Sequence, residues 1–252
     1  MEALIEYWNA LPFEYKLYYA VIILFIPLTI AGIIAQISVS STFNKCAVSA
    51  RCGLTAAQVA RRVLDANGLH DVQIVRIAGN LTDNFNPKTK VLSLSDAVYS
   101  KSTVSAIGVA CHEAGHAIQH SKKFFFSSLR LALVPVVNFA NRLLFPIMLV
   151  GMLLGFLGSG LFGIAGQVFV WAGVVIFGMS LLFSLVTLPT EFDASRRAQE
   201  VLREGYFTGE EAAMSRKVLT AAAMTYVVSF LMSLIQFLRF LAILLMRTNR
   251  RR

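Results

Sequence analysis

Four long apolar runs alternate with polar segments along the chain, at residues 17–38, 128–157, 161–188 and 224–246. A helix needs about 20 mostly apolar residues to cross the hydrocarbon core of a bilayer, which is roughly 30 Å thick. Each run meets that length, and the third contains no charged residue. The pattern predicts four membrane-spanning helices, the second and third joined by a short Gly-Ser-Gly turn.

The larger polar region, residues 39–124, has the periodicity of a small α+β unit. Apolar positions recur with helical spacing between Thr55, a suitable N-cap, and Gly68, which is typical of a helix end. Alternating patterns then predict two strands, within residues 71–79 and 90–96, around a turn rich in Asn and Pro. A further helix is expected to follow the second strand.

The smaller polar region, residues 189–223, predicts two shorter helices. Pro189 is typical of a helix start and Gly205 of a helix end. A second helix is expected after Thr208, which has Glu211 three residues on, as in a capping box.

These elements predict a mainly α integral membrane protein made of five consecutive segments. They are an N-terminal segment with the first membrane helix (1–38), the larger polar region (39–124), a membrane hairpin (125–188), the smaller polar region (189–223) and the fourth membrane helix with a basic tail (224–252).

Composition and charge agree with this organisation. Only 15% of residues are charged, against about 25% in soluble domains. The net charge is +9, and 11 of the 23 Lys and Arg residues lie between residues 39 and 130, with five more between 188 and 225. Four spans would place both polar regions on one side, so the positive-inside rule predicts that this side is cytoplasmic, although the basic tail opposes it. We attribute the charge to topology and anionic lipid, not to nucleic acid.

The segment CHEAGHAIQH, residues 111–120, holds three of the four histidines, in the helix expected from Ser100–Ser102 on. His112 and His116 are four residues apart, so they share one helix face, and Glu113 follows the first. This is the H-E-x-x-H pattern, in which two imidazoles bind zinc and the glutamate activates a water molecule. The alternative, incidental histidines on an amphipathic helix, leaves Glu113 unexplained. The motif predicts a small α+β, zincin-like catalytic region.

A catalytic zinc ion takes a third protein ligand and keeps one position open. His120 lies about 12 Å along the helix from His112, which is too far for one ion, so a surface position is expected. Glu191, in PTEFDASRRA, completes the set His, His, Glu. Asp193 is the weaker candidate and is expected to accept a hydrogen bond from an imidazole N–H. Alternatively, both are ordinary acids in the first turn of a helix.

The motifs AIGVACHEAGHAIQH and PTEFDASRRA, with LSDAVYSKSTVSA upstream, resemble the YugP-type membrane zinc metallopeptidases over roughly residues 40–225. The resemblance implies a multi-pass membrane protein that depends on Zn²⁺ and cleaves proteins. It implies His112, His116 and Glu191 as ligands and Glu113 as the base. More distantly, the layout is similar to that of the HtpX and Ste24 membrane proteases, which carry an acid where this chain has Ser195.

Two further roles stay open at this point. Tyr206 and Tyr226 are both candidates to donate a hydrogen bond to an oxyanion. The strand at 90–95 is either an edge strand that pairs with an extended substrate or a purely structural strand.

We therefore predict a zinc-dependent metalloendopeptidase that acts on membrane or membrane-proximal proteins at the cytoplasmic face of the cell membrane. Its expected partners are a protein or peptide substrate and the lipid bilayer, with an oligomeric or regulatory membrane partner left open. The alternative is a non-catalytic zinc-binding scaffold or partner-binding subunit. A metal transporter ranks last, because the apolar runs contain no pairs of acidic residues or histidines.

Overall fold

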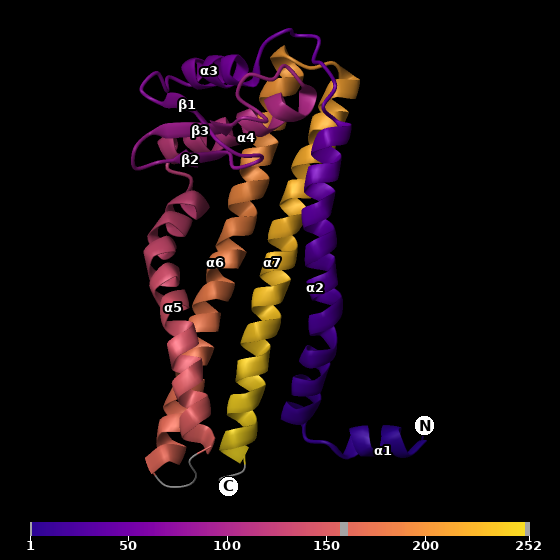
Figure 1. Ribbon diagram of the computed structural model, residues 1–252, viewed down its shortest axis with the longest axis vertical. Helices are drawn as coiled ribbons and strands as arrows, with labels where there is room; N and C mark the ends of the chain where they lie inside the picture. Colours follow the sequence, from indigo (N-terminus) through magenta and orange to yellow (C-terminus); the bar gives the residue numbers. More distant parts are fainter. Residues whose placement is uncertain (1, 157–160, 250–252) are drawn as a thin grey trace. The chain divides into compact units, whose positions relative to one another are not determined.

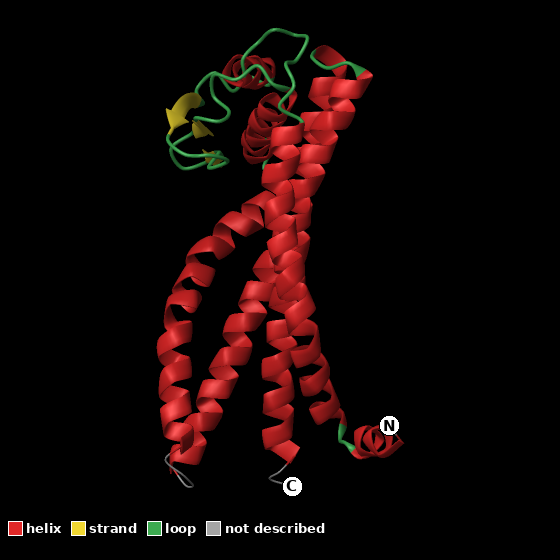
Figure 2. Ribbon diagram, turned by 45° about the vertical axis from the view of Figure 1, so that its right-hand side comes forward, coloured by secondary structure: helices red, strands yellow, loops and turns green. Residues whose placement is uncertain are grey.

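The computed structural model describes residues 2–156 and 161–249. Within these residues the protein is mostly helical and has one small mixed sheet (Figures 1 and 2). The elements follow in the order α1 (Glu2–Ala10), α2 (Phe13–Lys45), α3 (Ala56–Ala66), β1 (Gln73–Ile77), β2 (Asn84–Asn86), β3 (Val91–Ser95), α4 (Val104–Ser121), α5 (Phe125–Phe156), α6 (Leu161–Gly205) and α7 (Gly209–Asn249).

The chain divides into two compact units, each assembled from distant parts of the sequence. Unit 1 comprises Met1–Gly32, Leu131–Leu185 and Val228–Arg252, and its described elements are all helices. Unit 2 comprises Ile33–Arg130 and Val186–Val227. It contains α3, α4, the sheet and every residue of the predicted metal site.

Three helical segments are long and apolar enough to cross a membrane: Phe13–Lys45, Val168–Gly205 and Gly209–Met246. A fourth is obtained if α4 and the first part of α5 count as one bent span. Large apolar side chains of α2 are exposed, as expected for a surface in contact with lipid acyl chains. Three of the four predicted membrane helices, at the first, third and fourth apolar runs, are thus confirmed, while the second run lies in α5, which counts as a span only together with α4. The predicted Gly-Ser-Gly turn lies outside the described residues.

The helix α6 continues without a break from the third apolar run to Gly205, so the helix start predicted at Pro189 is wrong. Proline removes one N–H and usually kinks or ends a helix. Here the Thr190 hydroxyl donates a hydrogen bond to the Val186 carbonyl at 3.1 Å, which adds a contact within the same turn. Residues beyond the apolar run therefore continue on the same helix.

The start of α7 follows the predicted capping box. The backbone N–H of Thr208 donates to Glu211 Oε2 at 2.8 Å, and the Glu211 N–H donates to the Thr208 hydroxyl at 3.5 Å. The expected short helix and the fourth apolar run are, however, one helix that extends to Asn249. Residues 210–223, which connect the predicted cap to the fourth apolar run, contain neither Gly nor Pro, so nothing in this segment breaks a helix.

The sheet of unit 2 has the order β1-β3-β2, with β1 parallel and β2 antiparallel to β3. Part of the predicted turn is thus the strand β2. The strand β3 is paired on both sides, so the edge position considered for residues 90–95 is wrong, and β1 and β2 are the edge strands. Before β2, Asp83 accepts hydrogen bonds from the Ser95 N–H at 2.7 Å and the Ser95 hydroxyl at 3.0 Å. Burial raises the pKa of Asp83 above its ordinary value despite these bonds.

The core of unit 2 lies where α3 packs on α4 and α4 packs on β2 and β3. The helix α3 begins as predicted, because Thr55 and Gln58 form a reciprocal capping box, and Gly68 follows the helix end at φ 73°. The buried positions of α4 are mostly small or β-branched, and Ala106, Ala110 and Ala114 are fully buried. Small side chains let neighbouring elements approach the α4 backbone closely, which matters for the site below.

Candidate metal centre

The helix α4 places His112, Glu113 and His116 in one group. One potential ligand atom from each of the three side chains lies within 4.8 Å of the others. The two imidazole rings are edge to face, with centroids 4.8 Å apart, and their side chains are only 13% and 15% exposed. The four-residue spacing therefore produces the expected pair of rings on one face of α4.

The helix α6 brings Glu191 to this pair, although 79 residues separate it from His112. Its Oε2 atom lies 3.2 Å from His112 Nε2 and 3.5 Å from His116 Nε2, and its side chain is 2% exposed. The predicted residues on either side of the hairpin therefore meet at one point in unit 2.

Close contact between the backbones of α4 and α6 sets these distances. A Cβ atom on Gly115 would lie 2.8 Å from the carbonyl oxygen of Ala194 and 3.3 Å from its Cα atom. Glycine at this position lets α6 approach α4 closely, on the turn that carries His112 and His116. Glu191 precedes Ala194 by about one helical turn, so its position depends on the same contact.

The Nδ1 atoms of the two imidazoles are held by neighbouring side chains. Ser195 Oγ lies 3.1 Å from His112 Nδ1, and Gln119 Oε1 lies 3.0 Å from His116 Nδ1. The Gln119 amide nitrogen donates to the Thr190 carbonyl oxygen at 2.7 Å, so its oxygen is the atom left to accept the His116 Nδ1–H. This hydrogen bond leaves the Nε2 lone pair of neutral His116 directed at the site.

A guanidinium group fixes the carboxylate of Glu191. Arg130 donates to Glu191 Oε1 at 2.6 Å, while Oε2 faces the two imidazoles. Residues at the start of α5 can reach the end of α4 because the chain turns at Lys123, which has φ 50°. Arg130 therefore lies at one Glu191 oxygen and the two imidazoles lie at the other, so Oε2 is the oxygen positioned to share a metal ion with them.

The donor set fits zinc. Ligand atoms bound tetrahedrally at about 2.0–2.1 Å from zinc lie about 3.3 Å from one another. The distances from Glu191 Oε2 to the two Nε2 atoms, 3.2 and 3.5 Å, agree with this spacing. Two imidazole nitrogens and one carboxylate oxygen are also the chemical set that zinc takes in catalytic sites with an open fourth position.

Burial changes the proton affinity of the α4 groups. It raises the pKa of Glu113 above its ordinary value, although the nearby His116 and His112 oppose the shift. Burial lowers the pKa of His116, but the hydrogen bond and charge of Glu191 outweigh it, so that the pKa is raised. Zinc competes with the proton for His116, so binding is expected to release protons.

We expect the Gly115→Ala substitution to weaken zinc binding roughly 10- to 100-fold, because the new methyl group moves α6 and Glu191 away from α4. Zinc affinity, measured by competition with a chromogenic chelator, checks this. Gly205→Ala is the matched control, since no atom lies within 4 Å of its added Cβ. Equal affinities of the two variants would show that the backbone contact does not set the ligand spacing.

The two remaining candidates from the sequence, His120 and Asp193, have different surroundings in the structure. His120 is exposed beside the Phe85 ring, as expected for a surface residue. Asp193 hydrogen bonds Gln119 and pairs with Arg197, so the predicted bond to an imidazole is wrong: Gln119 and Ser195 occupy those positions. The Asp193 carboxylate is thus connected to His116 only indirectly, through the side chain of Gln119.

Three contributors to the site were missed by sequence reasoning. Gln119 is three residues after His116, a spacing at which helix side chains meet, so this signal was available. Ser195 is four residues after Glu191, on the same face of α6, and could have been found in the same way. Arg130 reaches the site only because of the turn at Lys123, and no periodicity indicates that turn.

Comparisons with known proteins agree with this geometry. A family model described as "Putative neutral zinc metallopeptidase" matches residues 21–245. The chain belongs to this family. It is also 44% identical over 228 residues to the "Putative membrane protease YugP" of Bacillus subtilis, covering 88% of this chain and 97% of that protein. No solved structure matches.

Membership in the zinc metallopeptidase family confirms the predicted YugP-type resemblance. Zinc is the cofactor that the family and the His–Glu–His group on α4 both indicate. The membrane helices and the membrane relative likewise agree on a multi-pass membrane protein.

Proposed function

We propose that the chain is a zinc-dependent metalloendopeptidase that hydrolyses peptide bonds of membrane or membrane-proximal proteins. In this proposal His112, His116 and Glu191 are the metal ligands, and Glu113 is the general base. The observation that carries it is the convergence of Glu191 Oε2 on the two Nε2 atoms at 3.2 and 3.5 Å, with a second carboxylate, Glu113, beside them.

Glu191 is preferred to Glu113 as the third ligand on geometric grounds. The distances from Glu191 to both imidazoles match those between zinc ligands. The Glu113 carboxylate and the imidazole nitrogens, in contrast, lie only within 4.8 Å of one another. A carboxylate that follows a ligand directly on the helix suits contact with a water molecule beside the ion. Arg130 supports the assignment, because it holds the other Glu191 oxygen and leaves one oxygen for the metal.

Bound zinc would supply Lewis acidity, which polarises a carbonyl group and lowers the pKa of coordinated water to about 7. Glu113 takes a proton from the attacking water at its carboxylate and returns it to the amide nitrogen as the C–N bond breaks. Water oxygen becomes part of the new carboxyl group, and the peptide nitrogen leaves as an amine. The buried position of Glu113 raises its proton affinity, which helps it to hold the proton between the two steps.

Tyr226 is the better of the two tyrosine candidates for stabilising the oxyanion. It lies near enough to Glu191, Arg130 and Glu113 for their charges to act on its hydroxyl group. Tyr206 instead interacts with Arg62 and Cys111. A phenol hydroxyl at the metal centre can donate to the developing charge on the carbonyl oxygen.

The site belongs to a zincin-like arrangement in this proposal, because the H-E-x-x-H helix α4 packs against a small sheet that has β2 at one of its two edges. The larger polar region supplies the histidines and the smaller one supplies Glu191, consistent with the five predicted segments. The excess of Lys and Arg in both regions supports a cytoplasmic location of the site at the cell membrane.

Removal of zinc tests the function directly. The purified full chain in detergent is expected to cleave casein, to lose roughly nine-tenths or more of this activity after treatment with 1,10-phenanthroline, and to regain it when zinc is added. Magnesium is the control metal, because it prefers six oxygen ligands. Cleavage that persists after the zinc has been removed would contradict the proposal.

A further inference from the structure

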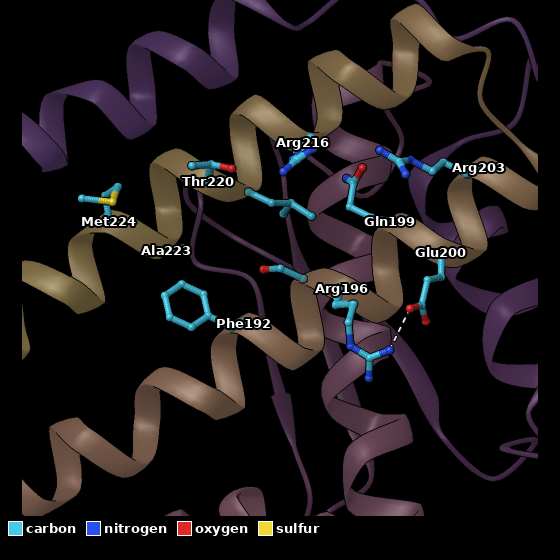
Figure 3. Close-up of a pocket in the computed structure, with 11 residues that line it drawn as sticks. Phe192, Arg196, Gln199, Glu200, Arg203, Arg216, Thr220, Ala223 and Met224 are labelled. Atoms are coloured by element: carbon cyan, nitrogen blue, oxygen red, sulfur yellow. Dashed lines mark hydrogen bonds and ion pairs between the residues drawn. The ribbon is translucent and has the colours of Figure 1, made fainter.

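A cavity of about 480 Å³ lies between α6 and α7 in unit 2 (Figure 3). Ser195 lines it, and Ser195 Oγ is also 3.1 Å from His112 Nδ1. The cavity therefore begins within one side chain of a proposed metal ligand. Its volume lies in the range of specific ligand sites, yet none of the roles assigned above uses it.

Two unpaired cations face this cavity. Of its three arginines, Arg196 is paired with both Asp193 and Glu200. Arg203 and Arg216 line the cavity too, and neither has an ion pair or a side-chain hydrogen bond with any residue that the structure describes. Two guanidinium groups on adjacent helices suit a carboxylate, which accepts paired N–H donors.

The opposite end of the cavity is apolar. Phe192 is 48% exposed and Met224 is 47% exposed, from α6 and α7 respectively. Figure 3 shows both at one end of the cavity, with Gln199 and Arg203 towards the other. The cavity thus offers an apolar contact at one end and an anion site at the other.

The distance between the two ends fits an extended peptide. Phe192 and Arg203 are eleven residues apart on α6, or about 16 Å along the axis. Met224 and Arg216 are eight residues apart on α7, or about 12 Å. An extended chain advances about 3.3 Å per residue, so four or five residues span the cavity.

An anionic lipid fits less well. The headgroup layer is only about 5–7 Å thick on each side of the hydrocarbon core. Arg203 lies fifteen residues beyond Leu188, the last residue of the uncharged run, which is about 22 Å along α6. An ordinary helix tilt of about 20° shortens this only slightly. If the hydrocarbon core ends with the uncharged run at Leu188, Arg203 lies beyond the layer in which a lipid phosphate would be found.

We propose that this cavity is a substrate subsite for an extended peptide segment with an apolar side chain near Phe192 and Met224. Four or five residues further on, the segment carries an acidic side chain, which binds Arg203 and Arg216. The inference rests on the proposed peptidase function, because it specifies the class of substrate sequence which that site accepts.

The test measures binding to the zinc-loaded full chain that carries Glu113→Gln, so that the peptide stays intact. Two fluorescent decapeptides, with leucine followed five positions later by glutamate or by glutamine, are compared by anisotropy. We expect the glutamate peptide to bind roughly tenfold more tightly. The further double substitution Arg203→Gln and Arg216→Gln should remove this preference without changing the affinity for the glutamine peptide.

Lys217→Gln is the matched control, because it removes a neighbouring charge of α7 that does not line the cavity. It should leave the tenfold preference intact. Equal affinities for the two peptides, or a preference that survives the double substitution, would overturn the subsite. Weaker binding of the double variant to phosphatidylglycerol nanodiscs, with peptide binding unchanged, would overturn it in favour of a lipid site. Casein cleavage by the wild type is measured in parallel, so failure of the peptidase function is seen separately.

Discussion

Glu113→Gln is expected to reduce peptide cleavage by roughly 10²- to 10⁴-fold, the range for loss of a general base. Glutamine keeps the volume and polarity of the side chain but cannot accept the proton from water at neutral pH. Because Glu113 is not a ligand in our assignment, the zinc content should stay at about one ion per chain. The measurements are kcat for a quenched fluorescent peptide and metal content by mass spectrometry.

Glu204→Gln is the control for this substitution, since Glu204 is an exposed glutamate on α6. It should leave both cleavage and zinc content unchanged. Normal cleavage by the Glu113→Gln variant would exclude Glu113 as the base. Intact zinc without cleavage by the wild type, under any condition tried, would instead favour the non-catalytic scaffold.

Glu191→Ala is expected to lower zinc affinity by about 100-fold or more and to abolish cleavage at limiting zinc. The substitution removes one of three protein ligands, and even residues that only support ligands change metal affinity 10- to 100-fold. It also leaves Arg130 without its buried partner, and because the Arg130 side chain is 30% exposed, the loss of stability should be smaller than the roughly 3–5 kcal/mol of a fully buried pair. Zinc affinity by chelator competition and the melting temperature of the zinc-free protein measure the two effects.

Glu191→Gln separates metal binding from stability. Its amide oxygen can still accept a hydrogen bond from Arg130, while its uncharged group is a much poorer zinc ligand. We expect a smaller loss of stability than for alanine and a similar loss of zinc. If Glu191→Gln kept zinc while Glu113→Gln lost it, the roles of the two carboxylates would have to be exchanged.

The elements that the sequence predicted well are those determined by neighbouring residues. The caps at Thr55 and Thr208 depend on side chains three residues away, and the structure contains both. The pair His112 and His116 depends only on helical spacing, and it lies on one face of α4 as predicted. Local spacing carries this information because it fixes side-chain positions within a helical turn.

The proximity of Glu191 to the histidines required a longer argument. It combined a metal motif that lacks a third ligand with a hairpin that returns the chain to the same side.

The details that failed depend on contacts between elements. Asp193 was expected at an imidazole, but Gln119 lies closer on α4 and already occupies that position. The pairing of β3 on both sides was likewise invisible, because β2 is only three residues long and lies in a segment rich in turn residues.

Pro189 shows why the helix boundaries were harder to predict. A single proline removes one hydrogen bond, but packing on both sides of it can keep a helix continuous. Thr190 and Glu191, the next two residues, are both buried in the structure. The sequence shows the missing N–H but not the contacts that compensate for its loss.

The contact between Gly115 and Ala194 has a consequence for the selection of metal ions. Main-chain atoms, which cannot change rotamer, hold the two helices together there, so the space between the imidazoles and Glu191 has little freedom to expand. Calcium binds oxygen atoms at about 2.3–2.6 Å and needs six to eight of them. A rigid opening lined by two nitrogens and one oxygen therefore discriminates against such large ions by size as well as by chemistry.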